Sequence, residues 1–239
     1  MFLGGIQKLS LLDYPGKLAC TVFTIGCNLR CPYCHNSGLV LSTDFDQDTG
    51  EVLRFLESRR GLLDGVCVTG GEPLLHLELP DFLRRMKDMG YLVKLDTNGF
   101  FPERLRAVAE EGLTDMVAMD IKNGPSHYAE TVGIPGVSAE PAGESRAFLL
   151  SGVTDYEFRT TVVRGLHTRE SLLEAAEWIA GAGAWYLQQF RDSGALIRPE
   201  GLSAFSDEEM RNLLTEVQRI IPAAKLRGID NNTGEERHV

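Results

Sequence analysis

The stretch GCNLRCPYCHN, residues 26–36, carries Cys27, Cys31 and Cys34 within eight residues. Three thiolates at the spacing Cys-x3-Cys-x2-Cys can occupy three corners of one small metal centre. A closed structural zinc site or a closed iron–sulfur cube uses four protein ligands. Three thiolates leave one iron of a [4Fe–4S] cluster open to an outside molecule. The spacing therefore predicts a site of chemistry, not one that only stabilises the fold.

Two other interpretations of the cysteines stay open. His35 could complete a zinc site, although ligands on consecutive residues point awkwardly at one ion and no second ligand pair follows downstream. A disulfide framework is disfavoured, because the cysteines total five and the start of the chain shows no signal-peptide pattern. Cys20 and Cys67 lie in apolar runs and are expected to be buried small side chains.

Composition predicts one domain with a substantial core. The 239 residues are 43% hydrophobic, and 24 basic against 34 acidic side chains give a net charge of −10. No basic stripe is visible, so no nucleic-acid partner is expected. No apolar run approaches the ~20 residues needed to cross a bilayer. We therefore expect a cytoplasmic protein with no membrane partner.

Apolar, β-rich runs alternate with helix-period segments along the chain. The predicted strands are 18–25, 65–69, 92–96, 115–119, 156–163 and 184–190. The predicted helices are 49–60, 80–89, 102–112, 144–151, 169–180 and 206–220, with a long loop over 123–143. This alternation predicts an α/β fold with a parallel sheet and right-handed crossovers. A partial barrel and an open, doubly wound sheet would both show it.

The candidate motifs all fall at the carboxyl ends of predicted strands, where parallel folds bind their ligands. The cysteine stretch follows the first strand, GGEP (70–73) follows the second, DTNG (96–99) ends the third and DIK (120–122) ends the fourth. A purely structural interpretation, with glycines in turns and acids at helix caps, explains any one motif. It explains the four together poorly, so one shared site is predicted.

These motifs, in this order, resemble the radical S-adenosylmethionine (SAM) superfamily, in which an aromatic residue, here Tyr33, precedes the last cysteine. The resemblance implies a partial, TIM-like (β/α)6 barrel and a single radical SAM domain over residues 1–239. The core would span about 18–190, followed by the C-terminal helix at 206–220 and a polar tail at 228–239. The resemblance also implies SAM and one [4Fe–4S] cluster per chain, with the three cysteines as iron ligands and catalytic residues.

The resemblance assigns further residues to the cofactor. Those expected to bind it are Tyr33, His35, Gly70, Gly71, Glu72, Asp96, Asn98, Asp120, Lys122, Arg159 and Thr161. The two glycines let the backbone approach the methionine moiety closely. Glu72 is expected near the ammonium group of SAM, and Lys122 is expected to form an ion pair with the carboxylate of SAM.

The remaining assignments concern the adenosine end and a metal ion. Arg159 and Thr161 share one face of a strand and are expected to contact ribose and adenine, with Tyr33 and His35 on the adenine side. Some activases carry a histidine where Phe190 stands, so the adenine environment should differ in detail. Asp96 and Asp120 should face each other, and two carboxylates need a cation between them. In the activases that this chain resembles, the matching acids help bind a monovalent cation.

Three further segments, 5–17, 158–163 and 187–191, resemble the activating proteins of anaerobic ribonucleoside-triphosphate reductase and, more broadly, the glycyl-radical-enzyme activases. The resemblance implies reductive cleavage of SAM and removal of a glycine Cα hydrogen from a partner enzyme. Because the chain has ligands for one cluster and no flavin motif, a flavodoxin or ferredoxin is expected as electron donor. The alternatives are an activase of another glycyl radical enzyme such as pyruvate formate-lyase, a radical SAM enzyme for a small molecule, and a non-catalytic zinc module.

Overall fold

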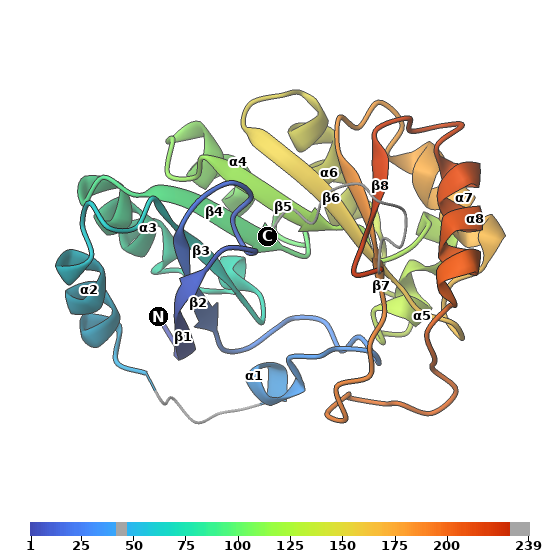
Figure 1. Cartoon of the computed structure of the whole chain (residues 1–239), viewed down its shortest axis with the longest axis horizontal. Coiled ribbons are helices and arrows are strands. Elements are labelled where there is room, and N and C mark those ends of the chain that lie inside the picture. Colours follow the sequence, from blue (N-terminus) through green and yellow to red (C-terminus); the bar gives the residue numbers. More distant parts are fainter. Residues whose placement is uncertain (42–46, 230–239) are drawn as a thin grey trace.

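The computed structural model describes residues 1–41 and 47–229, and one eight-stranded sheet forms its centre (Figure 1). The strands are β1 (Leu3–Ser10), β2 (Ala19–Thr24), β3 (Gly65–Gly70), β4 (Leu92–Thr97), β5 (Met116–Asp120), β6 (Asp155–Val162), β7 (Trp185–Gln189) and β8 (Ala224–Arg227). β1 pairs antiparallel with β2, and each later strand pairs in parallel with the strand before it.

The order of the strands decides between the two architectures that the sequence left open. Each strand lies beside the next one in the chain, from β1 at one edge to β8 at the other. A doubly wound sheet would reverse its strand order at a switch point, whereas a barrel-type sheet winds in one direction. The partial-barrel prediction is therefore confirmed, and the open doubly wound sheet is excluded.

Helices follow the strands and cover the outer face of the sheet (Figure 1). They are α1 (Ser37–Leu41), α2 (Thr49–Ser58), α3 (Leu79–Asp88), α4 (Pro102–Glu110), α5 (Tyr128–Thr131), α6 (Glu140–Leu150), α7 (Arg169–Trp178) and α8 (Asp207–Val217), with 3-10 turns η1 (Pro73–Leu75) and η2 (Pro125–His127). The six predicted strands correspond to β2–β7, and the six predicted helices to α2, α3, α4, α6, α7 and α8. Their ends agree to within four residues.

Two strands and several short helices were not predicted. β1 contains two glycines and several polar residues, and most of it is half-buried or exposed at the edge of the sheet. β8 has only four residues. The loop expected over 123–143 is wrong in part, because η2, α5 and the start of α6 lie inside it. Pro141 stands in the first turn of α6, where a missing N–H does no harm, so a proline that looked like a loop signal starts a helix.

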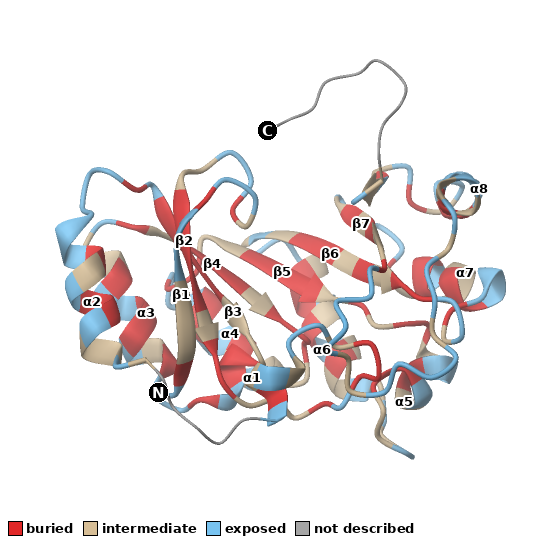
Figure 2. Cartoon of the chain, turned by 60° about the horizontal axis from the view of Figure 1, so that its bottom comes forward, coloured by how far each residue is buried: buried red, intermediate tan, exposed pale blue. Residues whose placement is uncertain are grey.

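The core lies between the sheet and the helices, as the buried residues in Figure 2 show. The middle of β3 is fully buried, and α3, which packs against β4, buries Leu79, Phe82, Leu83 and Met86. Burial of each such side chain contributes about 1.5–3 kcal/mol. The fold therefore holds the carboxyl ends of the strands in a fixed arrangement, and the candidate site is built on those ends.

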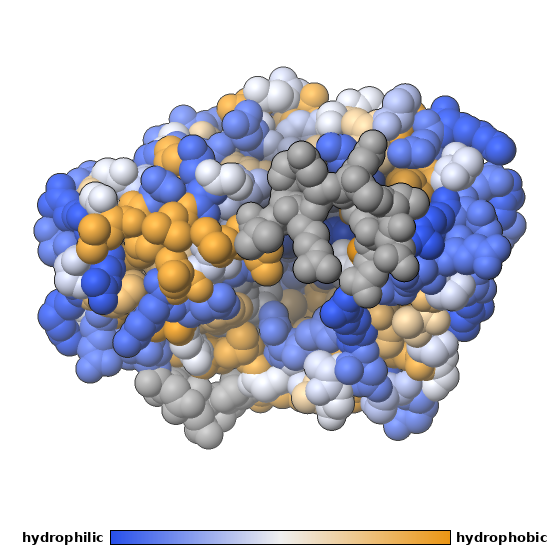
Figure 3. Space-filling view, in the orientation of Figure 1, coloured by the Kyte–Doolittle hydropathy of each residue, from blue (hydrophilic) through white to orange (hydrophobic). Residues whose placement is uncertain are grey.

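Exposed hydrophobic residues lie at the other end of the sheet, away from the carboxyl ends of the parallel strands. The segment between β1 and β2 precedes the first parallel strand, so it lies away from the carboxyl ends of the parallel strands. It exposes Leu11 and Leu12, and Leu9 near the end of β1 is also exposed. Figure 3 shows hydrophobic surface over this part of the molecule. Within the described ranges, no helix is long and apolar enough to cross a membrane.

Candidate active site

A cavity of about 260 Å³ lies at the carboxyl ends of β3–β7, beside the cysteine stretch that follows β2. All but one of the residues assigned to the site from the sequence line it: Cys27, Cys31, Tyr33, Cys34, His35, Gly70, Gly71, Asp96, Asn98, Asp120, Lys122, Arg159 and Thr161. Other lining residues were missed, among them Asn36, Thr69, Thr97 and Gln188. The fold thus brings the four motifs to one cavity, and binding of SAM there stays a prediction.

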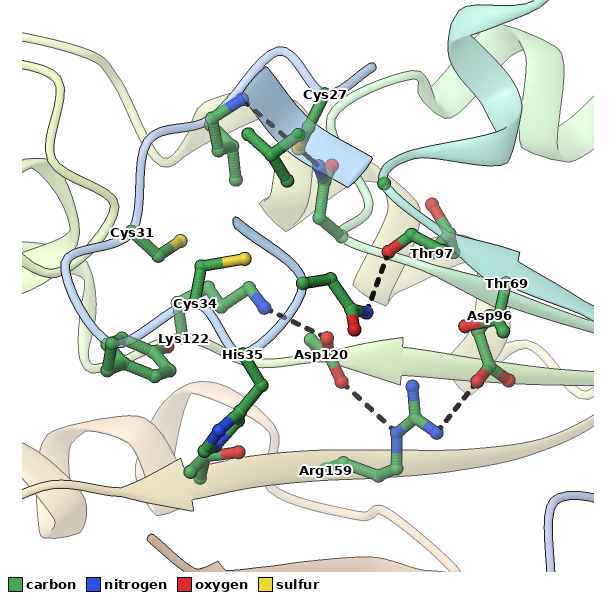
Figure 4. A pocket seen from close by; sticks show the side chains of 18 of the residues that line it. Cys27, Cys31, Cys34, His35, Thr69, Asp96, Thr97, Asp120, Lys122 and Arg159 are labelled. Atoms are coloured by element: carbon green, nitrogen blue, oxygen red, sulfur yellow. Dashed lines mark hydrogen bonds and ion pairs between the residues drawn. The ribbon is translucent and has the colours of Figure 1, made fainter. Parts of the chain in front are cut away.

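The three thiols of the cysteine stretch turn toward a shared space (Figure 4). Burial raises the pKa of Cys27 to about 12 and that of Cys31 to about 11. The sulfur of Cys27 accepts hydrogen bonds from the Leu29 N–H at 3.3 Å and from the Asn98 amide at 3.7 Å. Such donors to a ligating sulfur tune the potential of an iron–sulfur cluster.

The donor set fits a cluster better than a single ion. Among the described residues, no three His, Cys, Asp or Glu side chains are arranged to hold one metal ion, so the zinc interpretation gains no support. A [4Fe–4S] cluster takes each cysteine at a different iron, so its ligands stand apart around a cavity. Cys20 and Cys67 are buried elsewhere and do not line the cavity, in keeping with their assignment as core side chains.

The glycine pair at the carboxyl end of β3, Gly70 and Gly71, packs against the cysteine stretch. The Glu72 N–H donates to the carbonyl of Gly26 at 2.8 Å, and the Asn36 side chain donates to the carbonyl of Gly70 at 3.1 Å. A Cβ added to Gly71 would lie 1.9 Å from the Gly26 oxygen. Only a residue without a side chain allows this approach, so the glycines position the cysteine stretch as well as lining the cavity.

Glu72 is the exception among the predicted site residues. From the sequence we expected it near the ligand's ammonium, but it is fully buried and does not line the cavity. Its carboxylate accepts from the Leu74 N–H at 3.1 Å, the Thr97 hydroxyl at 2.8 Å and the Asn98 N–H at 2.7 Å. Burial raises its pKa to about 7, against these hydrogen bonds. Because it caps η1, its side chain turns inward and ties that turn to the end of β4.

Five charged side chains form an alternating row across β4, β5 and β6, which we call the charge row: Lys94, Asp96, Arg159, Asp120 and Lys122. Lys94 pairs with Asp96, and Arg159 lies 3.0 Å from Asp96 and 3.1 Å from Asp120. Lys122 lies 2.9 Å from Asp120. Figure 4 shows the guanidinium of Arg159 between the two carboxylates.

Four members of the charge row, Asp96, Arg159, Asp120 and Lys122, are ionised at neutral pH, because their opposite charges offset the cost of burial. Burial opposes ionisation of Asp120, yet Lys122 and Arg159 lower its pKa to about 2. The pKa of Asp96 is also lowered, against burial, by Arg159 and Lys94. Burial likewise works against the charged forms of Lys122 and Arg159, but Asp120 raises the pKa of Lys122, and Asp96 and Asp120 together raise the pKa of Arg159.

The charge row bears on two expectations from the sequence. A metal cation was expected between Asp96 and Asp120, and the guanidinium of Arg159 lies there instead. Arg159 was expected to contact ribose or adenine, but its NH1 and Nε groups are engaged by the two aspartates. Lys94 was missed. Strand alternation could have found it, because it stands two residues before Asp96 on the same face of β4.

The aromatic side of the cavity is built from the cysteine stretch and the end of β7. Tyr33 is buried, with its ring edge-on to His167 at 6.5 Å between centroids. His35 packs on Phe190 at 5.6 Å, with the ring planes tilted by 32°. Burial lowers the pKa of His35, so its imidazole is neutral at pH 7. Phe190, at the position where we noted a histidine in some activases, thus packs against the His35 ring. Contact of His35 or Phe190 with adenine stays a prediction.

Comparisons with known proteins identify the family of the chain. The model of the Radical SAM superfamily matches residues 21–185, and the chain belongs to this superfamily. Membership implies a [4Fe–4S] cluster and SAM. The fold also resembles the structure of SuiB from Streptococcus suis bound to S-adenosylmethionine, with a TM-score of 0.68 and 12% identity over 87% of this chain and 49% of that one.

Relatives with higher sequence identity indicate the group within the superfamily to which the chain belongs. A Methanocaldococcus jannaschii protein, provisionally named a glycyl-radical enzyme activating enzyme, is 30% identical over 200 residues, 80% of either chain. The pyruvate formate-lyase-activating enzyme of Clostridium pasteurianum is 35% identical over 124 residues, 49% of this chain and 51% of that one. The protein is thus a radical SAM enzyme of the glycyl-radical-enzyme activating group.

Proposed function

We propose that this protein binds one [4Fe–4S] cluster and SAM in the cavity and removes a Cα hydrogen from a glycine of a partner enzyme, and that this partner is anaerobic ribonucleoside-triphosphate reductase. The likeness to the Methanocaldococcus jannaschii protein, which spans 80% of either chain, carries this proposal. An oxygen-labile cluster and reduced thiols suit a cytoplasmic setting, which is part of the proposal.

Within this function, each group of lining residues has a physical task. Cys27, Cys31 and Cys34 would hold three irons and leave the fourth open. Lys122, at the end of the charge row nearest the cysteines, would pair with the carboxylate of SAM, since a charge-assisted hydrogen bond is among the stronger polar contacts. When bound, the reduced cluster and SAM supply the carbon radical that takes the hydrogen atom.

A glycine in a partner suits this chemistry. The Cα radical of a peptide glycine is stabilised by the two flanking amides, so it outlasts the encounter with the activase. The sheet is a partial barrel with free edges at β1 and β8, and such a fold leaves a side through which a loop of another protein can reach the cavity. The three cysteines supply ligands for a single cluster, so electrons would come from an external flavodoxin or ferredoxin.

Two partners have support. The sequence of residues 5–17 resembles the activating proteins of anaerobic ribonucleoside-triphosphate reductase and favours that enzyme. The relative from Clostridium pasteurianum is named for pyruvate formate-lyase, and this likeness makes pyruvate formate-lyase the second candidate.

Electron paramagnetic resonance tests the proposal. Anaerobically reconstituted protein is reduced and mixed with SAM and, in separate samples, with each candidate partner. We expect a doublet from a glycyl radical with one partner, and its loss when the partner's radical-bearing glycine is changed to alanine. A Cys34→Ala protein, which lacks one iron ligand, is the control and should give no doublet.

The same samples identify the competing functions. If neither partner gains a radical while an added small metabolite is consumed together with formation of 5′-deoxyadenosine, the protein is a small-molecule enzyme and the activase proposal fails. If the reconstituted protein holds zinc and no iron or sulfide, the zinc module replaces both radical functions.

A further inference from the structure

We propose that Arg159 takes the place of a monovalent metal cation in this site, so that SAM binding by this protein requires neither Na⁺ nor K⁺. The inference rests on the proposed function only in using the same SAM cavity. It starts from the disagreement between the cation expected beside Asp96 and Asp120 and the guanidinium that lies there.

The geometry places Arg159 as a bridge between strands. Arg159 in β6 is the register partner of Asp120 in β5, and Asp96 lies one strand further, in β4. The guanidinium reaches back across β5, so that NH1 lies 3.0 Å from Asp96 and Nε lies 3.1 Å from Asp120. The planar guanidinium thus contacts both carboxylates. It occupies the position between them where a metal ion was expected to bind.

The charge balance leaves no negative site for a metal. Asp96 already contacts Lys94 and Arg159, and Asp120 already contacts Arg159 and Lys122. The charge row therefore has three positive and two negative members and a net charge of +1. An added metal ion would be repelled by three neighbouring cations and would have to displace one from each carboxylate.

The positive charge of Arg159, unlike that of a bound metal ion, is always present at the site. The pKa of a guanidinium is above about 12 in proteins, so the group stays charged at any physiological pH. It is tethered to β6 and mostly buried, with 14% of its side chain exposed, so its local concentration does not depend on the salt in solution. The positive charge beside the cavity is then a constant of the fold, and affinity for SAM should not change when one salt replaces another.

Calorimetry of SAM binding tests the inference without a partner enzyme. The anaerobically reconstituted protein is titrated with SAM in potassium chloride, sodium chloride and choline chloride at equal ionic strength, because choline is too large to occupy a cation site. We expect dissociation constants that agree within about twofold. A twofold ratio corresponds to a difference in binding free energy of less than about 0.5 kcal/mol. Binding more than tenfold tighter in potassium or sodium than in choline would overturn the proposal.

An arginine variant supplies the second measurement. Arg159→Gln removes the charge and leaves two carboxylates with a gap between them, so we expect SAM to bind at least tenfold more weakly in choline and to recover in potassium or sodium. Arg164→Gln is the matched control. Arg164 is half-exposed, pairs with Glu209 outside the cavity, and its loss should leave all three dissociation constants unchanged. If Arg159→Gln shows no recovery in either metal salt, Arg159 does not replace a cation and the inference fails.

The ²³Na resonance in the presence of the wild-type protein keeps the inference testable even if Arg159→Gln does not fold. We expect no line broadening that excess potassium removes, whereas broadening that potassium removes would reveal a metal site and refute the inference. Failure here leaves the activase proposal standing. Conversely, salt-independent SAM binding without a glycyl radical on any partner would refute only the proposed function.

Discussion

Gly71→Ala tests the contact between the glycine pair and the cysteine stretch. The new Cβ would stand 1.9 Å from the carbonyl oxygen of Gly26, and ordinary contacts begin at 3.4 Å, so the two backbones must separate by about 1.5 Å. Overpacking of this kind costs about 1–3 kcal/mol. Gly26 directly precedes Cys27, so the displacement reaches the first iron ligand.

The expected result has two parts. Unfolding of the cluster-free protein by urea should show a free energy lower by about 1–3 kcal/mol than in the wild type. Cleavage of SAM by the reconstituted protein, with dithionite as reductant, should fall by about 100-fold, since a misplacement of about 1 Å near a reacting group has an effect of that size. Iron and sulfide per chain, measured in parallel, separate a lost cluster from a misplaced one.

Gly38→Ala is the control. Gly38 lies in α1, just after the cysteine stretch, and an added Cβ would meet nothing within 4 Å. If Gly71→Ala cleaves SAM within twofold of Gly38→Ala and unfolds at the same urea concentration, the close approach described here does not exist in solution.

Three further predictions concern the rest of the site. Cys31→Ala should abolish iron binding, while Cys67→Ala should keep about four irons per chain, and iron loss in the second protein alone would reverse the ligand assignment. Lys122→Ala should keep its cluster but cleave SAM about 10- to 100-fold more slowly, because a charge-assisted hydrogen bond is lost, and unchanged cleavage would remove Lys122 from the site. For Glu72, burial raises the pKa from 4.5 to about 7, so the folded state holds its proton more tightly than the unfolded state. The unfolding free energy of the cluster-free wild type, relative to Glu72→Gln, should therefore fall by about 3 kcal/mol as the pH rises from 4.5 through 7. A difference that stays flat across this range would show that Glu72 is not buried as described.

Local patterns were enough to predict most of the sheet. The central strands are apolar runs bounded by turn residues, so β2–β7 were found to within two residues at each end. β1 was missed because its sequence has two glycines and its side chains are mostly half-buried or exposed, which gives neither alternation nor an apolar run. Edge strands are held by pairing with a neighbour, and β1 is fixed by its register with β2.

The sequence by itself determined the cysteine triad and the meeting of four motifs at one edge, because ligand spacing is local and parallel strands end on the same side. The tertiary structure alone decided which charges neutralise which. Arg159 pairs with Asp120, 39 residues away, and with Asp96, 63 residues away, and no short pattern records such pairs. Glu72 turns inward for the same reason, since its partners Thr97 and Asn98 reach it only once β4 lies beside β3. Buried charges and polar groups must find partners wherever the fold brings them, so side-chain direction in this site follows from strand register.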